Sequence, residues 1–273
     1  MRKAALASAA FLFAAALSGC AGQQAFGGSR AAVEAWALQR GFVPQTLRAG
    51  TFDLLALSRT GTGAGLTIYI EGDGAAWSSP YHPPSDPTPP QPLALALAAA
   101  DTRADVVYLG RPCQYLESAA LAACPTDYWL QRRFAPEVVA AYMAAIDRLE
   151  AVHRAHRVTL VGYSGGGVIA ALLAQRRTDV EVLVTVAAPL ALGEWVRGHG
   201  VSELAGSLDP AAAGTTVRAT WAVHFVGERD KVVPPAVVER FVELKGGRLV
   251  RLADHDHDCC WARDWPGLLE DLR

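Results

Sequence analysis

Residues 158–171, VTLVGYSGGGVIAA, place a serine inside a glycine cluster, between an apolar run and a run of small apolar residues. The first six residues are mostly apolar and rich in β-branched side chains, which is typical of a buried strand. The residues from 168 to 177, VIAALLAQRR, predict a helix. The stretch therefore predicts a strand, a tight turn that contains Ser164, and a helix.

Runs of similar composition on both sides of this stretch predict further strands. They span residues 66–70, 105–109, 157–162, 181–187, 221–227 and 247–253. These runs are almost continuously apolar rather than alternating, as strands buried on both faces of a parallel sheet require. TFDLLALSR, at 51–59, predicts an earlier antiparallel strand at the edge of the sheet.

Helical patterns fill the intervals between these strands. They begin at Pro136, at 234 in PPAVVERFVELKGG and at 265 in WPGLLEDLR. Strands that alternate with helices predict an α/β fold, with a mostly parallel central sheet and helices on both faces. The chain has 273 residues, 51% of them hydrophobic, and neither an internal repeat nor a long linker divides it, so we expect one domain.

The N-terminus has the layout of a signal peptide. Arg2 and Lys3 precede an apolar stretch, residues 4–17, that is too short to span a bilayer comfortably. LSGC, at 17–20, resembles the lipobox of bacterial lipoproteins, in which the cysteine is acylated. We therefore expect a lipoprotein signal peptide at 1–19, a lipidated tether at 20–30 that starts at Cys20, and a folded domain at 31–273. The alternative is an ordinary secretory signal with an incidental cysteine.

Charge and location follow from the same segment. Ala21, rather than aspartate, after the cysteine favours the outer membrane by analogy with Gram-negative lipoproteins, so we expect a lipid-anchored protein of the cell envelope that faces the periplasm. The formal net charge of −2 becomes slightly more negative when Arg2 and Lys3 are removed. That balance gives no electrostatic basis for binding nucleic acid.

Four cysteines remain after Cys20, an even number in a chain expected in an oxidising compartment. Cys113 and Cys124 bracket one short segment, which favours a disulfide between them. Cys259 and Cys260 are adjacent and form either a vicinal disulfide or two free thiols.

The glycine cluster fits the pattern G-x-S-x-G at 162–166, in the strand-to-helix context that gives this pattern meaning. Small neighbours are needed there because the strand and the helix approach closely around a strained serine. A glycine-rich turn of this kind can instead bind phosphate. The G-x-G-x-x-G pattern and the P-loop lysine are both absent, which disfavours that alternative.

A serine needs a base, and the base needs an orienting group, so the pattern predicts an acid and then a histidine downstream. Asp230 follows a predicted strand and precedes a helix, although its charged neighbours also fit a solvated turn. His255 and His257 follow the last strand, and both would point the same way on an extended segment. Periodicity alone therefore leaves both histidines open.

The complete pattern resembles the α/β-hydrolase superfamily over roughly residues 50–273. That resemblance implies the α/β-hydrolase fold, with Ser164 as nucleophile and Asp230 as the residue that orients the base. It favours His257 as the base, because the histidine of the superfamily often lies shortly before an aromatic residue and the final helix, as His257 lies before Trp261. YIEGDGAAW, YLGRPCQY and HDCCW also resemble a bacterial subgroup of hydrolase lipoproteins.

The resemblance further implies an oxyanion hole formed by two backbone N–H groups. One belongs to Gly165, and the other belongs to the loop that contains Glu71 to Gly74. There we assign Asp73, with Gly74 as the next choice. Many relatives have histidine-glycine where this chain has Glu71-Gly72. An acid beside a developing oxyanion is compatible with catalysis only if its side chain points away or is bonded elsewhere.

These features imply a membrane-anchored serine hydrolase of the esterase, lipase or thioesterase kind, most simply a carboxylic-ester hydrolase. It would act through an acyl-enzyme on a small-molecule or lipid-like acyl substrate, with no cofactor. The alternatives are an acyltransferase and an envelope lipoprotein that keeps the fold without catalysis. The His, Asp and Cys run at 254–260 lacks the spacing of a metal site, so we expect no metal.

Three other segments are left without an assigned role. The proline-rich stretch at 80–92 predicts a stiff loop that forms either a pocket wall over the end of the sheet or a plain surface excursion. Residues 191–220 lie where related hydrolases often insert a cap. Arg111 and Tyr115, in RPCQY, either line the pocket or brace the disulfide loop.

Overall fold

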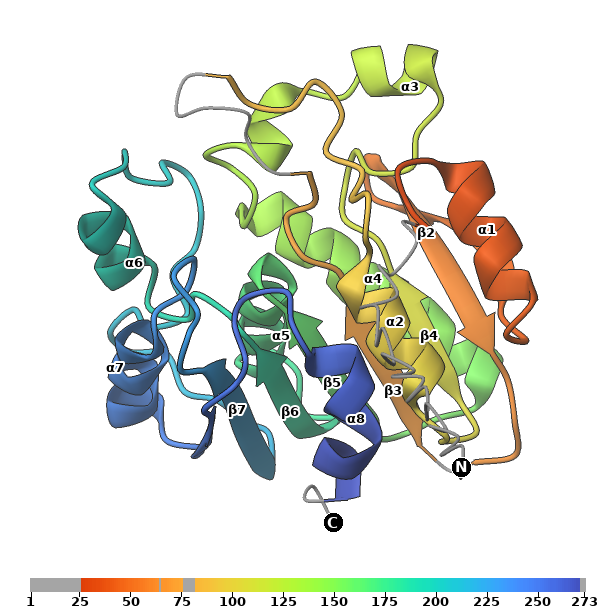
Figure 1. Ribbon diagram of the computed structural model, residues 1–273. Helices are drawn as coiled ribbons and strands as arrows, with labels where there is room; N and C mark the ends of the chain where they lie inside the picture. The colour runs from red at the N-terminus through yellow and green to blue at the C-terminus, as the bar shows by residue number, and fades with distance from the viewer. Residues whose placement is uncertain (1–25, 64, 76–81, 271–273) are drawn as a thin grey trace, which may run out of the picture.

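A computed structural model describes residues 26–63, 65–75 and 82–270. Its centre is an eight-stranded sheet (Figure 1). The order of the strands across the sheet is β1-β2-β4-β3-β5-β6-β7-β8. The strands are β1 (Val43–Ala49), β2 (Phe52–Arg59), β3 (Leu66–Ile70), β4 (Val106–Leu109), β5 (Val158–Tyr163), β6 (Val180–Val186), β7 (Trp221–Gly227) and β8 (Arg248–Leu252). β2 pairs antiparallel with β1 and β4, and the other pairs are parallel.

The predicted α/β architecture is confirmed, and β3 to β8 match the six predicted runs within one residue at each end. β2 is antiparallel as predicted, but its predicted place at the edge is wrong, because β1 pairs along its outer side. β2 is buried along nearly its whole length, as is typical of an interior strand of a sheet that is covered on both faces. In β1 only Leu47 and Ala49 are buried, and the strand contains Pro44, which edge strands tolerate. Its sequence therefore shows no clear strand pattern.

Helices cover both faces of the sheet. One face carries α1 (Arg30–Leu38), α2 (Leu93–Ala100) and α8 (Trp261–Glu270), and the other carries α4 (Pro136–His153), α5 (Gly165–Ala174) and α7 (Pro235–Lys245). In Figure 1, α2 and α8 lie in front of the central strands. The connections contain α3 (Ser118–Ala122), a short 3-10 helix (Thr126–Trp129) and α6 (Leu192–His199). α6 gives the segment at 191–220, expected as a cap position, a helix that the sequence did not predict.

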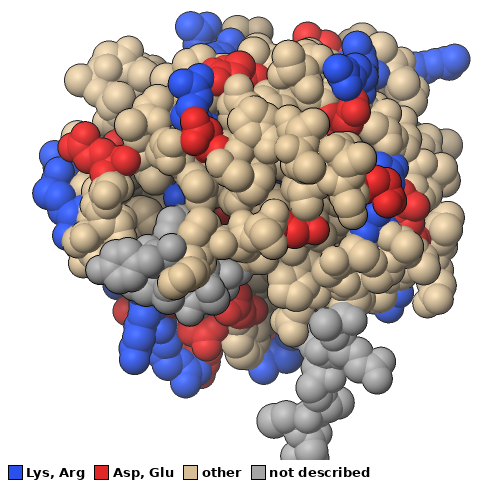
Figure 2. All heavy atoms as spheres, turned by 90° about the horizontal axis from the view of Figure 1, so that it is seen from above, with Lys and Arg blue, Asp and Glu red and all other residues tan. Residues whose placement is uncertain are grey.

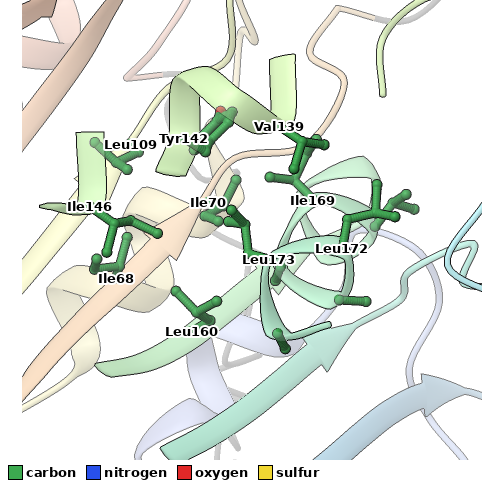
Figure 3. Close-up of a cluster of buried hydrophobic side chains, with 14 of the residues drawn as sticks. Ile68, Ile70, Leu109, Val139, Tyr142, Ile146, Leu160, Ile169, Leu172 and Leu173 are labelled. Atoms are coloured by element: carbon green, nitrogen blue, oxygen red, sulfur yellow. The ribbon is translucent and has the colours of Figure 1, made fainter. Parts of the chain in front are cut away.

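Alternate residues of each strand enter opposite cores. Ile68 and Ile70 of β3 pack on the face of α4 and α5, while Tyr69 between them packs on the face of α2 and α8. Figure 3 shows Ile68, Ile70 and Leu160 from the sheet facing helix side chains such as Ile146 and Leu173. Full burial of each such side chain stabilises the fold by about 1.5–3 kcal/mol, so the central strands are held from both sides.

We expect Leu160→Ala to lower the free energy of unfolding by about 2–5 kcal/mol, because it leaves a cavity in the middle of this core. Leu160 is fully buried, whereas Val152 on α4 is 69% exposed. Val152→Ala is the matched control and should change stability by less than about 0.5 kcal/mol. Urea denaturation of both variants measures the difference, and equal midpoints would contradict the prediction.

The last helix begins earlier than the sequence predicted. α8 starts at Trp261, one turn before the predicted start at Trp265, and both tryptophans are fully buried against the sheet. Their spacing of four residues places them on one helix face. The burial of these two rings therefore sets the start of the helix, and Pro266 lies within it rather than in its first turn.

The predicted signal peptide, including Cys20, lies outside the described residues. Of the predicted tether, Phe26 stacks on Trp36 of α1 with ring centroids 4.1 Å apart. The N–H groups of Gly27 and Gly28 donate to the carbonyls of Pro90 and Pro89 at 3.1 and 2.8 Å. These last tether residues are therefore packed on the proline-rich loop. Among the described helices, none combines the length and apolar character needed to cross a bilayer.

Candidate active site

Ser164 occupies the turn between β5 and α5. Its φ of 49° and ψ of −124° lie in a region that side-chain-bearing residues rarely adopt. The turn is held because the Ser164 N–H donates to the carbonyl of Val186 on β6, and the N–H of Gly167 donates to the Ser164 carbonyl, both at 2.9 Å. The neighbouring strand and the start of the helix thus fix the serine in this conformation.

The glycines around Ser164 are required by close contacts. A Cβ atom at Gly162 would overlap the backbone of Gly166, and one at Gly166 would overlap the carbonyl of Ile70 on β3. A Cβ atom at Gly167 would overlap the side chain of Ala188. The predicted close approach of strand and helix is therefore present, and it leaves no room for side chains at these positions.

The structure brings Ser164, His257 and Asp230 together. The Nε2 atom of His257 lies 3.1 Å from Ser164 Oγ, and its Nδ1 atom lies 2.9 Å from Asp230 Oδ2. The other oxygen of Asp230 accepts hydrogen bonds from the N–H groups of Val232 and Val233 at 2.8 and 2.7 Å. The carboxyl group is fully buried, so these bonds fix its orientation toward the imidazole.

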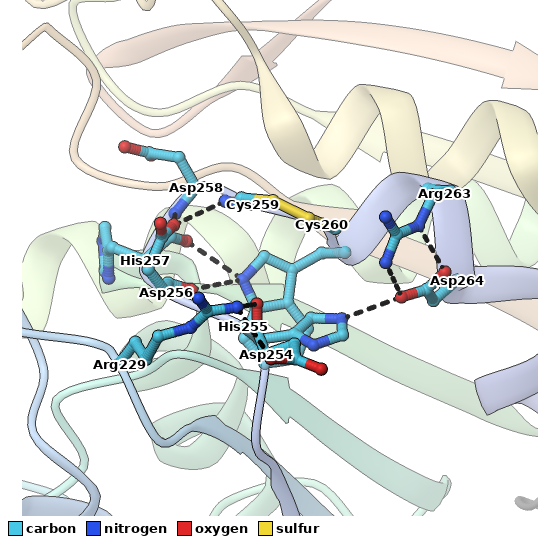
Figure 4. Close-up of a disulfide and its surroundings, with 11 residues drawn as sticks. Arg229, Asp254, His255, Asp256, His257, Asp258, Cys259, Cys260, Arg263 and Asp264 are labelled. Carbon is cyan, nitrogen blue, oxygen red and sulfur yellow. Dashed lines mark hydrogen bonds and ion pairs between the residues drawn. A yellow bond between two sulfur atoms is a disulfide. The ribbon is translucent and has the colours of Figure 1, made fainter. Parts of the chain in front are cut away.

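His255 lies away from Ser164, so the prediction that both histidines point the same way is wrong. Its ring packs on Trp261, with centroids 4.6 Å apart, and its Nε2 atom lies 3.2 Å from the Asp264 carboxylate (Figure 4). Burial lowers the pKa of His255, although Asp264 acts in the opposite direction. The segment is not extended, because the Asp256 carboxylate accepts the N–H groups of residues 258 and 259 and closes a turn.

Two aromatic side chains hold the His257 turn. The hydroxyl of Tyr163 donates to the His257 carbonyl at 3.2 Å, and its ring lies 5.3 Å from the imidazole. The indole N–H of Trp261 donates to the same carbonyl at 3.1 Å. Tyr163 is the variable position of the serine pattern, so the pattern itself gave no signal of this role.

The loop at 71–75 lies against the serine turn. A Cβ atom at Gly72 would come 3.1 Å from the Tyr163 ring and 3.4 Å from the Cβ of Ser164. The Asp73 carboxylate lies beside the Cα of Gly165, in the space a side chain there would need. The two predicted oxyanion donors thus belong to segments in direct contact. Within the described residues, neither the Gly165 N–H nor the Asp73 N–H has an acceptor.

The carboxylate of Asp73 is bound by two arginines. Its Oδ1 atom lies 3.0 Å from Arg111 Nη1, and its Oδ2 atom lies 2.8 Å from Arg133 Nη1. Burial acts to raise the pKa of Asp73, but the two guanidinium groups outweigh it and hold that pKa below its usual value. Asp73 is the acid that the sequence placed beside the expected oxyanion hole. Its negative charge is therefore offset by two positive charges. Arg111 thus braces this loop, and Arg133 was not predicted at all.

The proline-rich segment supports the same loop. Pro87 accepts a hydrogen bond from the N–H of Ala75 at 3.1 Å, and Pro87, Thr88 and Pro89 are buried. Seen from above, the described surface of this end of the molecule intersperses charges of both signs with uncharged atoms, and no broad patch of one sign is visible (Figure 2). Residues 87–89 are therefore packed against the loop at 71–75.

The predicted disulfide between Cys113 and Cys124 is present, and Cys259 and Cys260 are also bonded to each other (Figure 4). Among the described residues, no three His, Cys, Asp or Glu side chains are arranged to hold a metal ion. In the run at 254–260, Asp254 pairs with Arg229, His255 with Asp264 and His257 with Asp230.

Comparison with known proteins identifies the fold. No family model matches the chain, and no curated protein matches it. Among solved structures, Est1E from Butyrivibrio proteoclasticus is similar, with a TM-score of 0.56 and 12% identity over 84% of this chain and 96% of that chain. The serine hydrolase XC6422 from Xanthomonas campestris, described as lacking a lid, has a TM-score of 0.54 and 16% identity over 84% and 92%. Mouse α/β hydrolase domain-containing protein 10 has a TM-score of 0.58 and 12% identity over 84% and 98%.

At these identities the similarity concerns the fold and not the reaction. The sheet order, the helices on both faces and the serine turn after β5 agree with it. The chain has the α/β-hydrolase fold.

Proposed function

We propose that the protein is a serine hydrolase that cleaves a carboxylic ester through an acyl-enzyme, with Ser164 as nucleophile, His257 as general base and Asp230 as orienting acid. The observation that carries this proposal is the continuous chain of contacts from Ser164 Oγ through both imidazole nitrogens to a buried carboxylate. A serine hydroxyl becomes a useful nucleophile only when a base is placed to take its proton.

The chemistry follows from these positions. Ser164 Oγ attacks the carbonyl carbon of the ester while its proton moves to Nε2 of His257, and the imidazolium that forms is stabilised by Asp230. The tetrahedral intermediate then collapses, and the leaving alcohol takes the proton from Nε2. Water, deprotonated by the same nitrogen, cleaves the acyl-enzyme and restores the serine.

Backbone N–H groups of Gly165 and Asp73 would stabilise the negative charge on the intermediate's oxygen. Neither group has a backbone acceptor within the described residues. Gly165 directly follows Ser164, and Gly72, which precedes Asp73, lies against the Ser164 side chain. Donors fixed in place before the reaction stabilise such a charge without reorganisation. Arg111 and Arg133 support this arrangement, because they offset the one carboxylate beside it.

The proposed location is the bacterial cell envelope. Cys20, as the acylated residue of a lipoprotein, would anchor the domain to the outer membrane on its periplasmic side. This part of the proposal rests on the order of charge, apolar run and LSGC at the N-terminus. Acylation there would place the hydrolase beside lipid-like acyl substrates as well as small soluble esters.

Labelling of the purified, folded protein with a fluorophosphonate probe tests the proposed reaction. We expect one covalent adduct, located on Ser164 by peptide mass spectrometry, because only a serine with an oriented base reacts readily. Heat-denatured protein is the control and should not label. If the folded protein stayed unlabelled, catalysis by this serine would be excluded, and a non-catalytic envelope protein with the hydrolase fold would be favoured.

A further inference from the structure

The peptide group between Gly72 and Asp73 is held from its carbonyl side. The side-chain amide of Gln114 donates from Nε2 to the Gly72 carbonyl at 3.2 Å. In a trans peptide the carbonyl and the N–H point in opposite directions. The N–H of Asp73 belongs to the same peptide as that carbonyl, so it points away from Gln114.

The preceding N–H of the same loop is also bound. Glu71 Oε1 accepts from the Gly72 N–H at 2.9 Å and from the N–H of Ala94 at the start of α2 at 3.4 Å. Glu71 is buried, and burial raises its pKa to about 7. Both polar groups of Gly72 are therefore occupied, which leaves the Asp73 N–H as the next donor along the loop.

Gln114 itself has little freedom. Its side chain is almost fully buried, its Oε1 atom accepts the N–H of Arg111 at 2.9 Å, and Nε2 also donates to the Pro87 carbonyl at 3.3 Å. The acceptor Oε1 faces an N–H and the donor Nε2 faces two carbonyls, so the network fixes which way the amide points.

The turn that carries Gln114 is anchored on both sides. Cys113 is bonded to Cys124, and the N–H of Tyr115 donates to the hydroxyl oxygen of Thr88 at 2.8 Å. The hydroxyls of Tyr115 and Tyr108 lie 2.8 Å apart in the core. The RPCQY segment is therefore a rigid support that faces the 71–75 loop.

From these contacts we propose that Gln114 is a positioning residue, which sets the orientation of the Gly72–Asp73 peptide so that the Asp73 N–H serves as the second oxyanion donor. The proposal rests on the proposed hydrolase function. Gln114 does not itself contact the reacting atoms. A glutamine is required because the position needs an acceptor for the Arg111 N–H and a donor for the Gly72 carbonyl at once.

Two substitutions at Gln114 test the proposal. Gln114→Met removes the donor, and Gln114→Glu keeps the shape but places a second acceptor against the carbonyls of Gly72 and Pro87. We expect kcat for an activated ester to fall between about 10²- and 10³-fold, the range seen when one oxyanion donor is lost, with KM little changed. If Gln114→Met fails to fold, Gln114→Glu remains the informative variant because it is isosteric.

A second measurement separates positioning from general support of the fold. The affinity for a trifluoromethyl ketone, which forms a tetrahedral oxyanion on the serine, should fall in proportion to kcat/KM. The affinity for an unreactive amide analogue of the substrate should stay unchanged. Loss of affinity for both ligands to the same extent would overturn the proposal.

Gln175 provides the matched control. It is also a buried glutamine, and its Nε2 atom donates to the carbonyl of Pro210 at 2.7 Å, away from the 71–75 loop. Gln175→Met should lower the thermal stability but leave kcat unchanged. If wild type hydrolyses the ester and folded Gln114→Met does so equally fast, the positioning role is refuted while the hydrolase function stands. If wild type hydrolyses no ester and takes up no fluorophosphonate, the proposed function itself fails, and the positioning role fails with it.

Discussion

Replacement of Ser164 with alanine is expected to lower kcat for an activated ester by about 10⁶-fold, the size of effect seen when a hydrolase loses its nucleophile. The hydroxyl is the only group removed, and its oxygen lies 3.1 Å from the Nε2 atom of His257. No acyl-enzyme can form without it. The hydrolysis that remains would come from water attack assisted by the backbone donors beside the turn.

The measurement compares kcat of wild type and Ser164→Ala over several enzyme concentrations, with thermal unfolding of both as the control. Alanine has a Cβ atom like serine, so it keeps the same unfavourable backbone angles and should leave the stability almost unchanged. Turnover within tenfold of wild type in a folded Ser164→Ala protein would refute Ser164 as the nucleophile.

The second large effect is expected at His257, because its two nitrogens join Ser164 to Asp230. His257→Ala should lower kcat by about 10⁶-fold, nearly as much as loss of the serine. The double variant with Ser164→Ala should be no slower than either single variant, because the residues act as one unit.

His255→Ala is the matched control, since it removes a second histidine from the same loop. Its ring packs on Trp261 and pairs with Asp264, so its loss should lower the melting temperature without a large change in kcat. Steady-state kinetics and thermal unfolding of the two variants give the comparison. A large loss of kcat in His255→Ala, with His257→Ala active, would reverse the assignment of the base.

The sheet could be predicted from the sequence because its central strands are apolar on both faces. Because β3 and β5 are buried on both faces, their sequences are nearly continuous apolar runs. Such runs can be recognised without knowing which strands pair with them. β1 lacks this signal, since only Leu47 and Ala49 of its seven residues are buried and it contains Pro44. The position of β2 in the sheet depended on that missing strand, so it could not be predicted correctly.

For the candidate site, the sequence predicted which residue types lie at the ends of which strands. Ser164, Asp230 and the two histidines follow β5, β7 and β8 in the order that the chemistry needs. The choice between His255 and His257 depended on a turn closed by the Asp256 side chain, which a period of two cannot describe. Gln114 and Arg133 act through contacts with a loop far from them in sequence, and no local pattern indicates such contacts.

The conformation of Ser164 has a thermodynamic consequence for the whole protein. Backbone angles of this kind raise the free energy of the folded state by about 1–3 kcal/mol, while the total stability of a globular domain is only about 5–15 kcal/mol. The strain persists because β6 and the first turn of α5 hold the serine from both sides. The sequence is therefore less stable than its own fold would allow, and a glycine at 164 would be the thermodynamically preferred residue. Selection for maximal stability alone would have removed this serine.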